Sequence, residues 1–174
     1  MRPSTDSGRA VASPPSSAAP ASTDVALRLD ALVEEYWQRY LRLNPVSATA
    51  NGDNRYNDQL QLSISADFLS KEQSFYQQTL QRMGAIDLSQ ISDTPHLMAE
   101  ILQYELQTRL AKFPFRFERI PFHQFDGLPL TFAQLGSGAS SQPFKTVKDY
   151  DNWLKRIDAF TAWCRVAISR FREG

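Results

Sequence analysis

One loop of the sequence holds the residue types best suited to chemistry, ERIPFHQFDGLPLTF, residues 118–132. Its His123 and Asp126 lie close in sequence, and an imidazole beside a carboxylate can hold a metal or serve as a general acid–base pair. No serine or cysteine stands next to them to act as a nucleophile. Gly127 and Pro129 are typical of a tight connector, because glycine adopts positive φ at little cost and proline fixes the chain direction. We therefore interpret the loop as a structural connector and predict no catalytic residue in it.

Histidine and cysteine are too few and too far apart to build a metal centre. The sequence has two histidines, His96 and His123, so it cannot contain the HExxH helix of a zinc peptidase. Its one cysteine, Cys164, cannot form an internal disulfide or a thiolate cluster, and we expect it to be a small core residue. His96 and Glu100 are one helical turn apart and could touch, but such a pair is common and does not indicate a metal site. The sequence thus predicts no metal ligand and no cofactor held by this chain.

Composition and charge argue against several classes of partner. Nineteen basic and nineteen acidic side chains cancel, whereas nucleic-acid binders usually show a basic surplus. No run approaches the about 20 apolar residues of a membrane span. Gly136–Ser137–Gly138 resembles part of a phosphate loop, but the lysine that such loops require does not follow it. We expect no nucleic-acid partner and no transmembrane segment.

Apolar residues recur every three or four positions in several segments, which predicts an all-α fold of about four main helices. The expected helices cover residues 24–43, 66–83, 95–112 and 147–171. The expected N-terminal caps are Thr23 or Asp24, Ser65, Thr94 and Thr146, the last supported by Asp149. Gly84 suits the C-terminal end of the second helix, and Pro45 stops the first before a possible short helical turn.

Two further regions complete the expected organisation. Residues 113–144 are rich in proline, glycine and aromatic residues and predict an irregular connector, with short extended pieces possible. In the last helix, a stripe from Val147 to Phe171 is expected to line one side. Trp153 and Trp163 are expected on the far side, with nothing in the sequence to cover them, which suggests a truncated chain.

The N-terminal segment MRPSTDSGRAVASPPSSAAPASTD differs in composition from the rest. Residues 1–23 are rich in proline, serine and alanine and have no apolar core like that of a signal peptide. We interpret them as a disordered tether or the remnant left after a missing signal, followed by a helical region over residues 24–174. Such a tether favours the periplasm or the cell envelope, with the cytoplasm as the open alternative.

Three stretches, taken in order, resemble the bacterial family DUF885. The first stretch contains, in order, a helix, a proline, an Ala-Thr pair, a glycine and a tyrosine, and it reads YLRLNPVSATANGDNRYNDQL. The second stretch resembles the loop that follows in the family, and it reads IPFHQFDGLPLTFAQL. PFKTVKDYDNWLKRIDAFTAWCRVAISRFREG resembles the family's next helix. The matching positions are Pro45, Ala48, Thr49, Gly52, Tyr56, Tyr150, Leu154, Arg156, Arg172, Glu173 and Gly174.

The resemblance implies a gluzincin-type zinc metallopeptidase-like protein, a hydrolase, with its HExxH helix in a later part of a longer chain. This chain would then be the N-terminal helical part of a larger fold, inactive alone, and zinc would belong only to a full-length member. Its partners would be the missing C-terminal catalytic portion and a peptide substrate. His123 departs from the asparagine often found in the family's loop.

Within such a protein the chain would form one wall of a peptide-binding cleft. His123, Gln124 and Asp126 are then the candidates for lining that cleft. The alternative is a self-standing helical binding or scaffolding module without enzymatic activity, which would use its aromatic surface for a partner. An unrelated hydrolase built around His123 and Asp126 is the third possibility.

Overall fold

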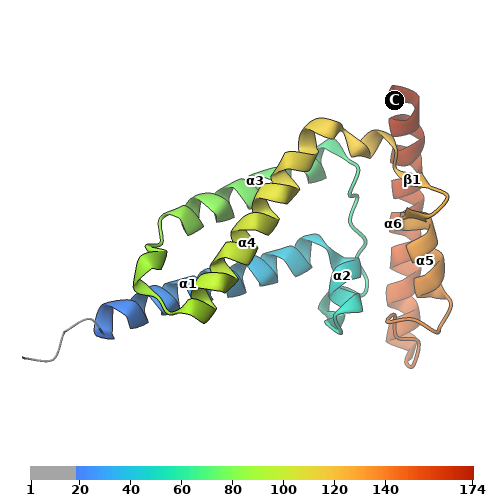
Figure 1. Ribbon diagram of the computed structural model, residues 1–174. Coiled ribbons are helices and arrows are strands. Elements are labelled where there is room, and N and C mark those ends of the chain that lie inside the picture. Colours follow the sequence, from blue (N-terminus) through green and yellow to red (C-terminus); the bar gives the residue numbers. More distant parts are fainter. Residues whose placement is uncertain (1–18) are drawn as a thin grey trace, which may run out of the picture.

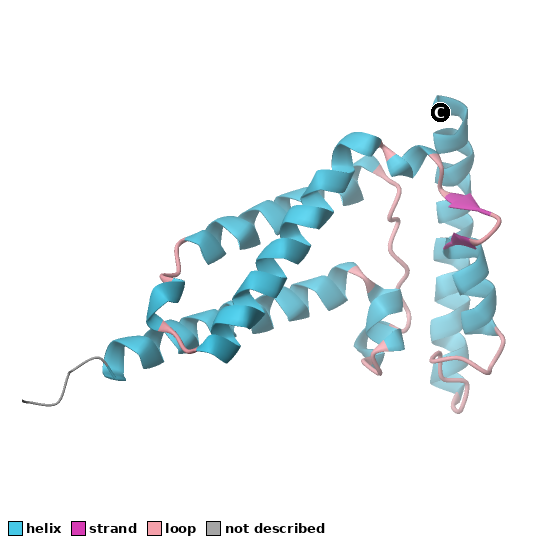
Figure 2. Ribbon diagram, viewed as in Figure 1, coloured by secondary structure: helices cyan, strands magenta, loops and turns pink. Residues whose placement is uncertain are grey.

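The computed structural model describes residues 19–174, which are mainly helical with one small antiparallel sheet (Figures 1 and 2). The α-helices are α1 (Ala19–Leu43), α2 (Pro45–Ala50), α3 (Ala66–Gly84), α4 (Asp93–Lys112), α5 (Leu128–Gly136) and α6 (Val147–Glu173). Single turns of 3₁₀ helix are η1 (Asn54–Tyr56), η2 (Leu88–Gln90), η3 (Phe113–Phe115) and η4 (Phe117–Arg119). The strands are β1 (Phe122–His123) and β2 (Asp126–Gly127). The expected all-α class is confirmed.

Helices α1, α3 and α4 pack together around the first core (Figure 1). Each helix buries one stripe of its surface, and together the stripes remove large apolar side chains from water. The buried members of this core are Leu32, Tyr36, Phe75, Tyr76, Met83, Leu102 and Leu106. The rings of Tyr36 and Phe75 stack with centroids 5.4 Å apart, which joins α1 to α3.

Helices α5 and α6 form a second block beside this one, and Figure 1 shows them running side by side. The ring of Phe132 on α5 stacks on Trp153 at 4.5 Å and on Phe160 at 4.3 Å, both on α6. The helices come close at Gly136, where an added Cβ would lie 2.6 Å from the Trp153 ring. Only a residue without a side chain fits there, which explains the glycine at the end of α5.

The extended chain between η1 and α3 joins the second block to the first. The Arg170 Nε atom donates to the Ile64 carbonyl at 2.8 Å, and the Trp163 indole N–H donates to the Ser63 hydroxyl at 3.4 Å. Ile64, Trp163 and Ala167 are buried together in the second core. Cys164 is partly buried and packs against this core, in line with its expected place.

Helix ends confirm some of the expected caps and correct others. Ser65 caps α3, and Thr146 caps α6 through a capping box with Asp149. Helix α4 starts earlier than expected, with Ser92 rather than Thr94 at the N-cap. Pro95 therefore lies inside the first turn, where proline is tolerated because the N–H groups there have no intrahelical partner.

Three further boundaries differ from the sequence-based prediction. Helix α1 begins at Ala19, inside the segment expected as a tether, and the rest of that segment, residues 1–18, lies outside the described residues. Helix α3 ends at Gly84 with Ala85 as its cap, so no left-handed glycine closes it. The connector 113–144 contains α5, which the prediction missed, and its expected extended pieces are β1 and β2.

Helix α6 has apolar residues on two neighbouring sides, and the structure corrects which of them is covered. Trp163 is 1% exposed and Trp153 is partly buried, so the expectation that these rings stay uncovered is wrong. The exposed side instead carries a stripe that we call the outer face of α6. It consists of Val147, Tyr150, Leu154, Ile157, Ile168 and Phe171. Within residues 19–174 no helix has both the length and the apolar character needed to cross a bilayer.

Candidate functional site

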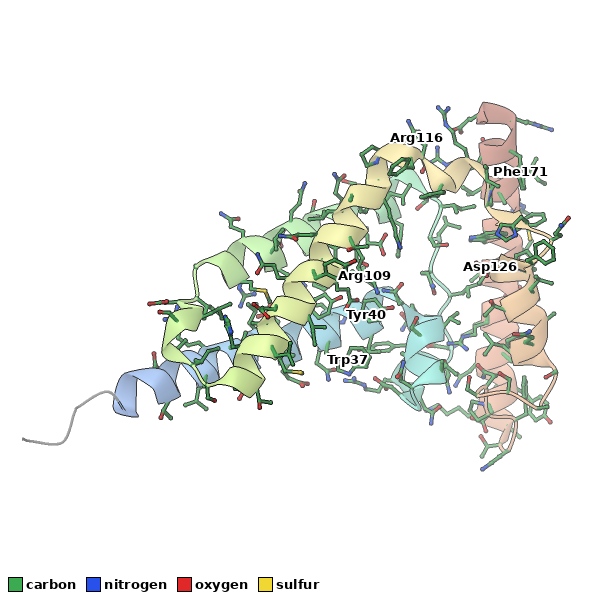
Figure 3. The ribbon with its side chains drawn as sticks, viewed as in Figure 1. Trp37, Tyr40, Arg109, Arg116, Asp126 and Phe171 are labelled. Atoms are coloured by element: carbon green, nitrogen blue, oxygen red, sulfur yellow. The ribbon has the colours of Figure 1, made fainter. Side chains whose placement is uncertain are left out.

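The predicted cleft residues lie on an exposed hairpin. His123 pairs with Asp126 in the β1–β2 register, and Gln124 is in the turn between the strands, with all three side chains exposed. Their local bonds are to the backbone: the Phe125 N–H donates to His123 Nδ1 at 3.2 Å, and the Gly127 N–H donates to Asp126 Oδ1 at 2.7 Å. Figure 3 labels Asp126 in the hairpin beside α6. The hairpin therefore brings the three side chains together at the surface, and none of them lines the cavity described below.

Gly127 makes the hairpin possible. Its φ of 139° lies in a region that side chains rarely allow, and an added Cβ would lie 2.3 Å from the Phe122 Cβ atom. The sequence-based prediction of a tight connector at Gly127 agrees with this geometry. Among the described residues, no three His, Cys, Asp or Glu side chains gather in a group that could hold a metal ion.

A buried arginine joins the two helical blocks. Arg156 on α6 is 0% exposed and donates to five oxygens of other segments. Its Nη2 atom donates to the Thr49 hydroxyl at 2.7 Å and to the Pro45 and Tyr56 carbonyls at 3.2 Å each. We call this arrangement the Arg156 clasp. Its remaining acceptors are the Gln59 carbonyl, at 2.9 Å from Nε, and the Gln142 side-chain oxygen on Nη1.

The guanidinium of Arg156 is a buried cation that forms no ion pair with a carboxylate in the part of the chain that the structure describes. Burial lowers the pKa of Arg156 to about 10, which still leaves the guanidinium charged at neutral pH. Five oxygen acceptors replace the water that the group loses, and this satisfaction of a buried polar group is what makes its burial tolerable. Thr49 is itself buried and also bonds to the Asn57 side chain at 2.7 Å. The clasp therefore fixes α2 and η1 against α6.

The clasp also gives a physical meaning to residues that carry the family resemblance. Pro45, Thr49 and Tyr56 come from one resembling stretch and Arg156 from another, a hundred or more positions away. The structure brings all four into contact. The remaining stretch, the loop with His123 and Asp126, does not take part in these bonds.

A cavity of about 180 Å³ opens beside the first core, between α3, α4 and the 3₁₀ turns that follow α4. We call it the α3–α4 cavity. Its walls combine charged and aromatic side chains. They are Leu69, Glu72 and Tyr76 from α3, Arg109 and Lys112 from α4, and Phe113, Phe117 and Glu118 from the turns. Arg116 has a left-handed backbone (φ 53°), which turns the chain between η3 and η4 and so helps to place Phe117 and Glu118.

A hydrogen-bond network runs from this cavity through the helical layer. The Tyr76 hydroxyl donates to Glu72 at 2.9 Å and accepts from Arg109 Nη1 at 3.2 Å. Arg109 Nε donates to Glu105 at 2.8 Å, and the Tyr36 hydroxyl donates to the same carboxylate at 3.2 Å. Figure 3 shows Arg109 extending from α4 towards Tyr40 on α1, and its guanidinium carbon lies 5.0 Å from that ring's centroid.

Burial sets the protonation of the groups in this network. It raises the pKa of the Tyr36 and Tyr76 hydroxyls, so both remain protonated donors near neutral pH. Burial also raises the pKa of Glu72, against the opposing effects of Tyr76 and Arg109. A cavity with convergent polar groups and a carboxyl of raised pKa has the features of a small-molecule binding site.

The sequence-based search missed this cavity because its residues come from distant segments. One signal was present: Glu105 falls within the apolar stripe of α4, between Leu102 and Leu106. A carboxylate at such a position needs a partner, and the structure supplies Arg109 and Tyr36. Glu72 and Lys112 gave no signal in the sequence.

Comparison with known proteins gives one family. Residues 45–174 match the family described as bacterial protein of unknown function, DUF885. The match begins at Pro45, the first residue of α2, and extends through the last helix. No match was found among curated proteins or among solved structures.

Proposed function

The chain belongs to the DUF885 family, and from this premise we propose that it forms a non-catalytic helical wall of a peptide-binding cleft in a zinc metallopeptidase-like protein. The metallopeptidase part of the proposal comes from the sequence resemblance. The HExxH helix that the resemblance implies has no counterpart among the two histidines of this chain. Zinc and the catalytic groups would therefore belong to another part of the protein.

The observation that carries the proposal is the outer face of α6. Leu154 is 58% exposed and Ile168 is 55% exposed, although both repeat at the spacing of a packed helix face. Apolar residues repeated along one line of a long helix are typical of a surface that packs against protein. We propose that the catalytic portion covers this stripe.

The hairpin extends this apolar surface towards the proposed cleft. Phe122 on β1 contacts Phe171 on α6, with ring centroids 5.1 Å apart. Phe125 at the hairpin turn is 81% exposed. Aromatic rings next to the polar groups of His123 and Asp126 suit an extended peptide, which offers both apolar side chains and backbone hydrogen-bonding groups.

Peptide binding to this chain tests the proposal. Fluorescence anisotropy of a labelled mixed-sequence decapeptide should show saturable binding that Phe125→Ala weakens by about fivefold, since the loss of one aromatic contact is worth about 1 kcal/mol. Leu27→Ala is the matched control, because Leu27 is also exposed (63%) but lies on α1. Equal binding by the two variants, or no binding at all, would contradict a cleft at the hairpin.

A second function, a self-standing helical binding module, is favoured by the internal joints of the fold. The Arg156 clasp and the second core tie α6 to residues 45–64 without any partner chain. Size-exclusion chromatography with thermal melting separates the two functions. A monomer with one sharp transition supports the self-standing module, whereas concentration-dependent association through the outer face of α6 supports the wall of a larger protein.

A further inference from the structure

The α3–α4 cavity has an arrangement of charges that the proposed function does not use. Four charged side chains line it, two acidic and two basic. Arg109 pairs with Glu105 at 2.8 Å, and Glu118 pairs with Arg116 outside the cavity lining. Neither Glu72 nor Lys112 forms an ion pair among the described residues. The cavity thus offers one carboxylate and one ammonium group without a direct ion-pair contact in the described part of the chain, although Arg109 lies near Glu72 beyond Tyr76.

The remaining lining is apolar and aromatic. Leu69 and Phe113 are partly buried, and Phe117 is 62% exposed at the edge. Lys112 is also exposed, so solvent reaches the cavity from this side. Small-molecule sites commonly combine such walls with a few charged groups that fix the orientation of the ligand.

We propose that the α3–α4 cavity binds a free α-amino acid with an apolar or aromatic side chain. The ligand's ammonium group donates to Glu72 and its carboxylate accepts from Lys112, while its side chain packs against Leu69, Phe113 and Phe117. A zwitterion supplies both missing charges at once, so neither Glu72 nor Lys112 stays unpaired. A cavity of about 180 Å³ suits a single small molecule rather than a peptide.

The neighbouring network prepares Glu72 for this role. The Tyr76 hydroxyl holds the Glu72 carboxylate at 2.9 Å, and Arg109 in turn holds Tyr76 at 3.2 Å. A carboxylate whose position is fixed by neighbours loses less conformational entropy when a ligand binds. Arg109 is itself neutralised by Glu105, so it does not repel the ligand's ammonium group strongly.

Calorimetric titration of the chain with L-phenylalanine, and with analogues that each lack one group, tests the inference. N-acetyl-L-phenylalanine lacks the ammonium group, and L-phenylalaninamide lacks the carboxylate. Each should bind about tenfold more weakly than L-phenylalanine, because each loses one charge-assisted hydrogen bond. Glycine, which lacks the side chain, should also bind more weakly. No binding of L-phenylalanine, or equal binding of either analogue, would overturn the inference.

Two variants assign the charges to residues. Glu72→Gln keeps an oxygen that accepts from Tyr76 but removes the charge, and it should abolish the preference for L-phenylalanine over its N-acetyl form. Lys112→Gln should abolish the preference over the amide. Glu100→Gln and Lys148→Gln, both at exposed positions outside the cavity, are the matched controls and should bind as the unmodified chain does. Retention of both preferences in the cavity variants would contradict the assignment.

The inference is independent of the proposed peptide cleft. The residues of the α3–α4 cavity and those of the hairpin do not overlap. Loss of peptide binding in Phe125→Ala should therefore leave binding of L-phenylalanine unchanged, and the two proposals can fail separately.

Discussion

Replacing Arg156 by methionine removes the guanidinium of the Arg156 clasp while keeping an unbranched side chain of similar length. Some of the five acceptors keep another hydrogen-bond partner after this substitution. The Tyr56 carbonyl still accepts from the Gln59 N–H at 3.0 Å. The single proton of the Thr49 hydroxyl can go to the Pro45 carbonyl at 3.0 Å or to the Asn57 side-chain oxygen at 2.7 Å, so this hydroxyl keeps a partner in either case. The Gln59 carbonyl and the Gln142 side-chain oxygen are left without a protein donor.

The size of the effect follows from these two oxygens. An unsatisfied buried polar group costs about 1–3 kcal/mol, which applies to the buried Gln142 oxygen, and the Gln59 carbonyl costs less because its bond is only part-buried. Methionine offsets part of this cost, because the variant no longer buries a charge. We expect a net loss of about 2 kcal/mol in the free energy of unfolding. Arg156→Lys keeps the charge but not the planar set of donors, and we expect it to lose about half as much.

Urea unfolding followed by circular dichroism measures this loss. Arg165→Met is the control on the same helix, since Arg165 is exposed, and it should change stability by less than about 0.5 kcal/mol. The slope of the transition should stay constant in all variants, so that the midpoint shift reports stability. An Arg156→Met protein as stable as the control would refute the view that the clasp holds the two blocks together.

Three further predictions concern other parts of the fold. Glu72→Gln should raise the free energy of unfolding at pH 7 and lose this advantage on acidification. Burial raises the folded-state pKa of Glu72, so the native carboxyl binds its proton more readily than the unfolded one. The unmodified protein therefore gains stability as the pH falls through the raised pKa. Unfolding of both proteins at a series of pH values checks this, and parallel pH profiles would contradict it. Gly136→Ala should lose about 1–3 kcal/mol, because its Cβ would lie 2.6 Å from the Trp153 ring, and a shift in tryptophan fluorescence should accompany the loss. Thr146→Ala removes the capping box of α6 and should cost about 1 kcal/mol in thermal unfolding, whereas Thr161→Ala, at an exposed position within the helix, should cost less.

Local sequence patterns predicted most helices because their signals are local. The apolar spacing of α1, α3, α4 and α6 was sufficient to locate them, and side-chain caps at Ser65 and Thr146 marked two starts. Helix α5 was missed because glycine and proline border it, and both are typical of loops. Pro129 lies near the start of that helix, where proline is compatible with helical structure.

Tertiary relations were less accessible from sequence. Helix α6 has apolar side chains on more than one side, and spacing alone cannot decide which side packs against the remainder of the chain. Trp163 and Arg156 turned out to lie on the covered side. The pairing of Glu72 with Tyr76 lies within one helix, but Arg109 reaches Tyr76 only because α3 and α4 are neighbours. Such contacts follow from the fold and not from any motif.

The most direct test of the central claim is peptide turnover by the purified chain. The protein is incubated with a mixture of synthetic peptides, with and without equimolar zinc, and the products are measured by mass spectrometry. A non-catalytic helical wall of a DUF885 protein predicts that the peptides remain intact under both conditions. Zinc-dependent cleavage that copurifies with the chain and is lost in His123→Ala would contradict it.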